Sequence, residues 1–135
     1  MLWLRKINFT KAEIKEITKA LDGYAWIVMD IKKGIVVVGD EYVMNMKNIL
    51  LKDRCSLEDI FGVGLDLATG EIDYYSQVNI KWTDKDSTRE VPLGQRVRVT
   101  TLIEYFFMEL PAFRKETSKK YPTNRSLFRM RRVER

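Results

Sequence analysis

Hydrophobic and polar positions alternate along the chain with two different periods, and the change of period separates predicted helices from predicted strands. Thr10-Lys11-Ala12-Glu13 has the spacing of a helix capping box. Ile14, Ile17 and Leu21 then recur at helical intervals until Gly23, a residue that commonly follows the end of a helix. This pattern predicts a helix over residues 11–22.

The next two apolar runs, 24–32 and 35–39, are rich in Trp, Ile, Val and Met. Gly34 stands between them and can adopt the positive φ of a tight turn, so the two runs are predicted to pair as an antiparallel hairpin. Met46, Ile49 and Leu50 then return to helical spacing. They predict a short helix over residues 44–52.

A second hairpin is predicted from strict alternation over residues 63–67 and 72–82, with a turn at Thr69-Gly70. In either register that matches the apolar faces, Asp66 faces an acid: Asp73 across a two-residue turn or Glu71 across a four-residue loop. Like charges in such positions destabilise a sheet, which favours a cation or the basic tail nearby. The alternative is that water and salt screen the pair.

Residues 97–110 carry two conflicting signals. Their β-branched residues favour a strand, whereas their apolar residues form a stripe at helical spacing that favours a helix ended by Pro111. We predict the helix, with a stripe made of Val99, Leu102, Ile103, Phe106, Phe107 and Leu110.

Together these elements predict an α+β fold, in which two β-hairpins form a mostly antiparallel four-stranded sheet with helices on one face. Residues 2–8 are a candidate edge strand. The layout predicts a single domain over residues 1–110 and a basic C-terminal tail over residues 111–135.

The charge distribution points to a partner. Residues 111–135 hold nine basic and two acidic residues, a net charge of +7, whereas the rest of the chain sums to −2. Such a tail favours an acidic partner, nucleic acid or an acidic protein. The alternative is an extension that docks on a second subunit in a homodimer. The nucleic-acid-binding candidates are Arg114, Lys115, Lys119, Lys120, Arg125, Arg129, Arg131 and Arg132.

Composition excludes several classes of site. The chain has one cysteine and no histidine, which removes an internal disulfide and the usual Cys/His metal frameworks. No motif for a cofactor, a metal or a catalytic group is recognised, and Cys55 is best explained as an inert thiol. No apolar run approaches the length of a membrane span, and we expect a cytoplasmic protein without a membrane partner.

Several short motifs in the centre of the chain resemble a small bacterial family that is known only as a domain of unknown function. They are Asp30-Ile31, Gly34, Gly39-Asp40-Glu41, Leu50-Leu51, Asp59 before Phe61-Gly62, and Ser76-Gln77-Val78-Asn79-Ile80. The resemblance covers about residues 10–110. The chain differs from the family pattern at Val43 and Asn45, where the family has a histidine and an aspartate. The resemblance implies a shared fold and a shared polar site, and it carries no activity.

Four polar residues lie among apolar neighbours and also match the family pattern: Asp30, Glu41, Ser76 and Asn79. Carboxylates beside a hydroxyl and an amide suit acid–base chemistry or a hard cation. The competing interpretation is that each side chain satisfies backbone groups at the end of a strand.

Taken together with the charge of the tail, these observations lead us to expect a binding domain that contacts nucleic acid or another acidic partner. A homo-oligomeric interaction module is the alternative, and an enzyme is the third hypothesis.

Overall fold

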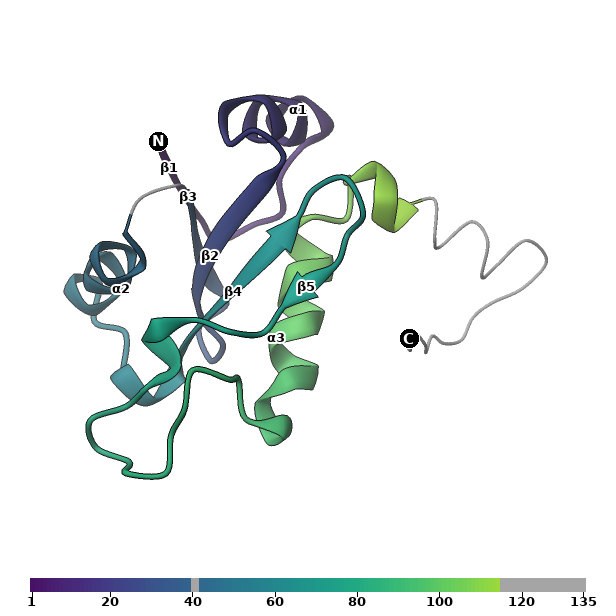
Figure 1. Cartoon of the computed structure of the whole chain (residues 1–135). Helices are drawn as coiled ribbons and strands as arrows, with labels where there is room; N and C mark the ends of the chain where they lie inside the picture. The colour runs from purple at the N-terminus through teal and green to yellow at the C-terminus, as the bar shows by residue number, and fades with distance from the viewer. Residues whose placement is uncertain (40–41, 115–135) are drawn as a thin grey trace.

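The structure is a computed structural model that describes residues 1–39 and 42–114. Its centre is one antiparallel sheet of five strands in the order β1-β3-β2-β4-β5 (Figure 1). The predicted α+β class with a mostly antiparallel sheet is confirmed, and the candidate edge strand forms. The strands are β1 (Leu2–Arg5), β2 (Tyr24–Asp30), β3 (Ile35–Gly39), β4 (Ile60–Asp66) and β5 (Ile72–Asp73).

The first helix and the first hairpin form as predicted. Helix α1 (Lys11–Ala20) begins with both hydrogen bonds of the capping box: the Glu13 N–H donates to Thr10 Oγ1 and the Thr10 N–H donates to Glu13 Oε1. Strands β2 and β3 then pair across a turn in which Gly34 has a φ of +71°. Only glycine adopts this conformation readily, so the turn depends on that residue.

Helices cover both faces of the sheet, not one as predicted. Helix α2 (Val43–Lys52) packs on one face, here called the α2 face, and α1 and α3 (Leu93–Phe106) pack on the other. The reason lies in residues 27–29 of β2 and in β3, where side chains on both faces are apolar and buried. A strand that is apolar on both sides needs a cover on each side.

The ambiguous segment after residue 92 is a helix. Val99, Ile103 and Phe106 of α3 are buried against the larger core, so burial of the apolar stripe outweighs the modest helix cost of β-branched residues. The helix begins at Leu93, four residues before the predicted start, and ends at Phe106. Pro111 opens a short helical turn over residues 111–114.

The second predicted hairpin is correct in its first strand and wrong in most of its second. Strand β5 has only two residues, and Leu65 pairs with Ile72, which gives the four-residue loop in which Asp66 faces Glu71. Beyond β5 the chain leaves the sheet, and from Asn79 to Trp82 the expected pattern of burial is reversed. Lys81 is 7% exposed, whereas Trp82 is 85% exposed.

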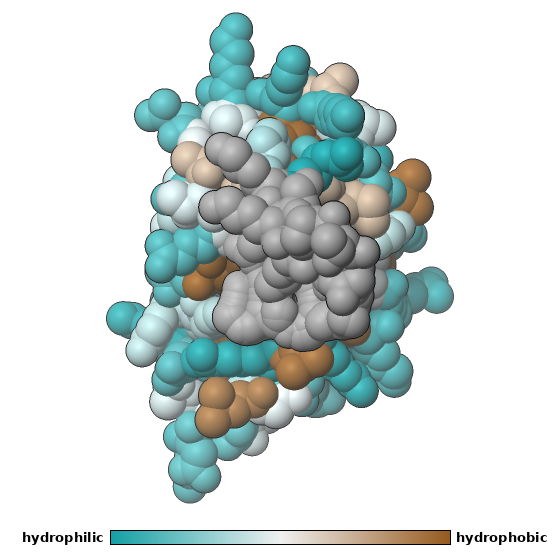
Figure 2. Space-filling view, turned by 90° about the vertical axis from the view of Figure 1, so that its right-hand side faces the viewer, coloured by the Kyte–Doolittle hydropathy of each residue, from teal (hydrophilic) through white to brown (hydrophobic). Residues whose placement is uncertain are grey.

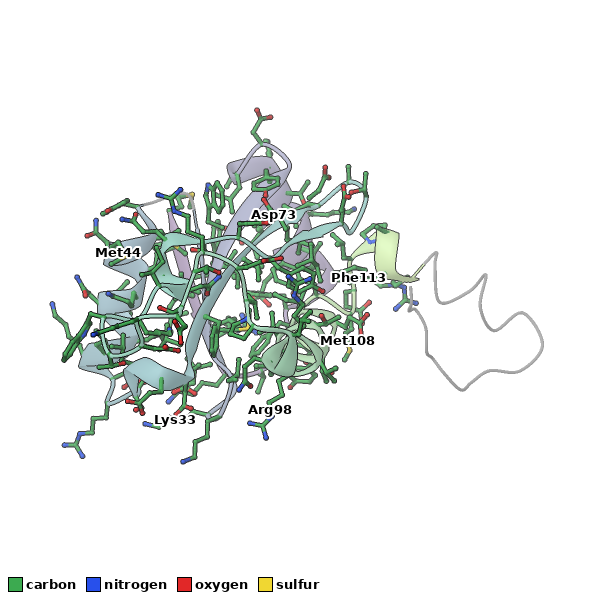
Figure 3. All side chains as sticks on the ribbon, turned by 60° about the horizontal axis from the view of Figure 1, so that its bottom comes forward. Lys33, Met44, Asp73, Arg98, Met108 and Phe113 are labelled. Carbon is green, nitrogen blue, oxygen red and sulfur yellow. The ribbon has the colours of Figure 1, made fainter. Side chains whose placement is uncertain are left out.

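Two short 3₁₀ helices complete the described elements, η1 (Leu57–Asp59) and η2 (Gln77–Asn79). Seen from the side where residues 111–114 lie, the surface is mainly hydrophilic with separate apolar residues (Figure 2). Arg98 and Lys33 point outward from α3 and from the β2–β3 turn (Figure 3). Among the described residues, no helix combines the length and the apolar character needed to cross a membrane.

Candidate functional site

Asp30 is fully buried at the end of β2, with its side chain on the α2 face. Its Oδ1 accepts hydrogen bonds from the backbone N–H groups of Lys32 and Lys33, each at 2.8 Å. These two bonds shape the turn between β2 and β3, as a carboxylate does in an Asx turn. The side chain therefore serves its own hairpin.

The second oxygen of this carboxylate, Oδ2, has no hydrogen-bond partner within normal geometry among the described residues. The carboxylate is a neighbour of the buried Cys55 thiol. Burial, and then the neighbouring Asp30 carboxylate, raise the pKa of Cys55 to about 11. The thiol is thus protonated at neutral pH, and because the thiolate is the reactive form, Cys55 is not an activated nucleophile.

Ser76 and Asn79 meet at Gly62 in the middle of β4. The Asn79 side chain accepts a hydrogen bond from the Gly62 N–H at 2.8 Å and donates one to the Gly62 carbonyl at 3.0 Å. It also donates to the Arg89 carbonyl at 2.8 Å. The amide therefore pairs with β4 as the backbone of a neighbouring strand would, and all of its polar atoms are satisfied.

Gly62 is required for this approach. A side chain on Gly62 would overlap Val78 Cγ2 and would lie 2.6 Å from Ser76 Oγ. The Ser76 hydroxyl accepts from the Val78 N–H at 3.4 Å, which helps to turn the chain into η2. The short motif around Ser76 and Asn79 is thus a device for closing the outer edge of β4.

Lys81 continues the same pairing two residues further along. Its Nζ donates to the carbonyl of Ile60 and, at 3.1 Å, to that of Val78. The ammonium group also lies 4.6 Å from the centre of the Phe61 ring, a favourable cation–π contact. Burial, and to a smaller extent the Lys47 cation, lower the pKa of Lys81 to about 8.

Asn79 and Lys81 lie at one end of a cleft of about 580 Å³ beneath the loop that leads into α3. Arg96 and Glu90 line the same cleft and form an ion pair at 2.7 Å, while Arg96 Nε donates to the Val91 carbonyl at 3.2 Å. The Arg96 guanidinium lies over the Tyr74 ring, 4.7 Å from its centre. Arg96 and Glu90 are therefore paired although both stay partly exposed, while the buried Asn79 and Lys81 pair mainly with the backbone of β4.

The structure brings two of the four candidate residues together and leaves one apart. Asp30 pairs with Ile60 across β2 and β4, whereas Asn79 lies on the far side of β4 at Gly62. Asn79 lies two strand spacings and two residue steps away from Asp30, which puts their Cα atoms about 12 Å apart. Glu41, and all tail candidates except Arg114, lie outside the described residues.

Sequence reasoning missed Lys81, Glu90 and Arg96. In the strand predicted over residues 72–82, Lys81 lies on the polar face, where a lysine is common and indicates no particular function. The signal in the sequence that could have identified Lys81 is its position two residues after Asn79. Within the described part of the chain, no group of three or more Cys, Asp or Glu side chains is arranged to hold a metal ion.

The comparisons with known proteins bear on the family resemblance. No curated protein and no solved structure matches the chain. A family model described as "protein of unknown function (DUF5674)" matches residues 4–106. This range confirms the resemblance expected over residues 10–110, and the chain belongs to this family of unknown function.

Proposed function

We propose that the protein is a non-enzymatic binding domain that contacts nucleic acid through its basic C-terminal segment, residues 111–135. The single observation that carries this proposal is the charge distribution: +7 in these 25 residues and −2 in the other 110. Because the rest of the chain has a net negative charge, this segment carries the strongest attraction to phosphates. This partner fits the cytoplasmic location expected from the sequence.

The described residues support binding more than catalysis. Asp30, Asn79 and Lys81 direct their hydrogen bonds to backbone groups of the same domain. A catalytic acid, base or nucleophile needs to present its reactive atom to a substrate, and none of these three does so in this arrangement. Arg114, the one described tail candidate, pairs with Glu109 at 3.0 Å and keeps a side-chain exposure of 55%.

The test is binding of the full chain to a fluorescent DNA duplex and to single-stranded RNA, followed by anisotropy at several salt concentrations. If about five basic side chains neutralise duplex phosphates, log Kobs should fall with log salt at a slope of about −4.5. The variant Arg129→Gln/Arg131→Gln/Arg132→Gln should flatten that slope by about 2.7, because three phosphate contacts are lost.

The matched control is Lys11→Gln/Lys15→Gln/Lys19→Gln. These three lysines are exposed on α1, so the control removes the same net charge from a different surface. It should leave the slope within about one unit of the wild type. Equal losses in both variants, or binding that does not depend on salt, would remove the proposed role of the segment and leave an acidic protein as the partner to test.

A homodimer is the second candidate function, and the free side of β1 favours it. Strand β1 pairs only with β3 among the described residues, and Leu4 is 49% exposed. An open strand edge with an exposed apolar residue is suited to pairing with a second copy.

If this edge forms the dimer, light scattering should give twice the chain mass, and Leu4→Lys should return the protein to a monomer with an unchanged circular dichroism spectrum. Arg5 is left intact because it pairs with Glu13. A monomer in the wild type at micromolar concentration would exclude this interface.

A further inference from the structure

The described residues leave part of the α2 face of the sheet uncovered. Helix α2 packs over Val28, Val37 and Ile60, but Trp26 on the same face remains 38% exposed. Its in-register neighbours on β3 and β4 are Gly39 and Gly64. Neither glycine has a side chain, and the space over them is taken by the side chains of Leu2 and Tyr24.

Tyr24 extends this surface. Its ring makes an edge-on contact with Trp26, with 5.3 Å between ring centres, and its hydroxyl lies over Gly64. Partial burial, followed by the charges of Asp73, Asp66 and Glu71, raises the pKa of Tyr24. The strand register puts Asp66, Glu71 and Asp73 on the same face of the sheet as Tyr24 and Trp26, and we call these five residues the aromatic–acidic surface.

The aromatic–acidic surface is matched to arginine and lysine side chains. Carboxylates pair with their charges, and the faces of Trp and Tyr attract cations. The three acids belong to the β4–β5 hairpin, where Asp66 faces Glu71 and the like charges oppose each other. A basic segment over these acids removes that repulsion.

The described chain ends beside the same hairpin. Phe113 and Ala112 pack against Gly70 in the β4–β5 loop: a side chain on Gly70 would lie 2.8 Å from Phe113 Cε1 and 3.3 Å from Ala112 Cβ. Figure 3 shows Phe113 at the point where the described residues end. The remaining 21 residues, 115–135, carry eight basic and two acidic side chains. Ala112 and Phe113 pack on the face of the sheet covered by α1 and α3, whereas the aromatic–acidic surface lies on the α2 face. A chain of that length spans at most about 70 Å, which is ample to pass around the edge strand β5 from one face to the other.

We propose that residues 115–135 dock on the aromatic–acidic surface of their own chain. Charge complementarity and the position of Phe113 beside the hairpin carry the inference, and it does not depend on the nucleic-acid role. If both hold, nucleic acid and this surface compete for the same basic residues, so the surface tunes how tightly the protein holds a polyanion.

The test is the rate at which trypsin cleaves the full chain within residues 115–135, followed by mass spectrometry. Docked segments resist cleavage, and the rate follows the undocked fraction when docking is rapid. The isosteric variant Asp66→Asn/Glu71→Gln/Asp73→Asn should raise the rate about fivefold. Asparagine keeps the oxygen with which Asp66 accepts from the Ala68 N–H and Asp73 from the Tyr75 N–H, so the hairpin is retained.

The matched control, Glu16→Gln/Asp53→Asn/Asp86→Asn, removes three exposed acids elsewhere and should leave the rate unchanged. Trp26→Gln tests the aromatic part of the surface. It should raise the cleavage rate, and its circular dichroism spectrum should stay close to that of the wild type. Equal rates in the wild type and both surface variants would overturn the proposal. Protection that grows with protein concentration would also overturn it, because it would assign the surface to a second copy.

Discussion

Asn79→Ala is expected to lower the free energy of unfolding by about 3 to 5 kcal/mol, measured by urea denaturation. The substitution removes the amide that serves the N–H and the carbonyl of Gly62 and the carbonyl of Arg89. All three backbone groups then lose their partner in a site where Asn79 is only 1% exposed. Each unsatisfied buried group costs about 1 to 3 kcal/mol.

Two variants sharpen this measurement. Asn79→Asp keeps an acceptor for the Gly62 N–H but has no donor for the two carbonyls, so it should also be strongly destabilising. Gln77→Ala, in the exposed part of η2, removes a hydrogen bond with Tyr42 at 3.2 Å and should cost about 0.5 kcal/mol or less. A loss below about 1 kcal/mol in Asn79→Ala would mean that β4 does not need this edge partner.

Raising the pH from 8 to 10.5 is expected to stabilise the protein through Lys81 by about 3 kcal/mol relative to a Lys81→Met variant. The pKa of Lys81 is lowered from 10.5 to about 8 in the folded state. Below pH 8 both states hold the proton, and the folded state bears the full cost of a buried charge. Between pH 8 and 10.5 the unfolded chain keeps the proton and the folded chain releases it, so stability rises with pH.

The measurement is the difference in unfolding free energy between wild type and Lys81→Met at several pH values. Other titrating groups, including Tyr24, cancel in that difference. Lys85→Met, an exposed lysine in the following loop, is the matched control and should give a flat difference. A flat difference for Lys81→Met as well would show that the folded protein keeps Lys81 charged at little cost.

The parts of the fold that the sequence predicted are those set by local signals. The capping box at Thr10 and Glu13, the glycine at position 34 and the apolar stripe of α3 each act within a few residues. The family resemblance was also readable, since its short motifs lie in these local elements and at their ends.

The region after β5 was not predictable in the same way. Alternation over residues 72–82 indicated a strand with Trp82 inside, but the alternation belongs to a ladder of side chains. Asn79 meets Gly62 and Lys81 meets Ile60, so two steps forward along the chain match two steps back along β4. A pattern with a period of two does not distinguish a backbone partner from a side-chain partner, and the Ile60 carbonyl that accepts from Lys81 is 21 residues away in sequence.

The candidate site shows the same limit. Asp30 and Asn79 are both buried polar residues of the family pattern, as predicted, yet each satisfies a different stretch of backbone. Residue type and apolar neighbours signal burial. Whether two such residues converge depends on strand order, which single-sequence patterns do not contain.

The side-chain ladder on β4 also constrains how the length of the chain can vary. Removing one residue between Asp73 and Asn79 would bring Ile80 opposite Gly62, and adding one would bring Val78 there, so that an apolar side chain would stand where an amide is needed. The tip of the following loop, around Lys85 and Asp86, is exposed and meets no such requirement. Insertions and deletions among members of this family should therefore accumulate at the tip and spare the five residues between Asp73 and Asn79.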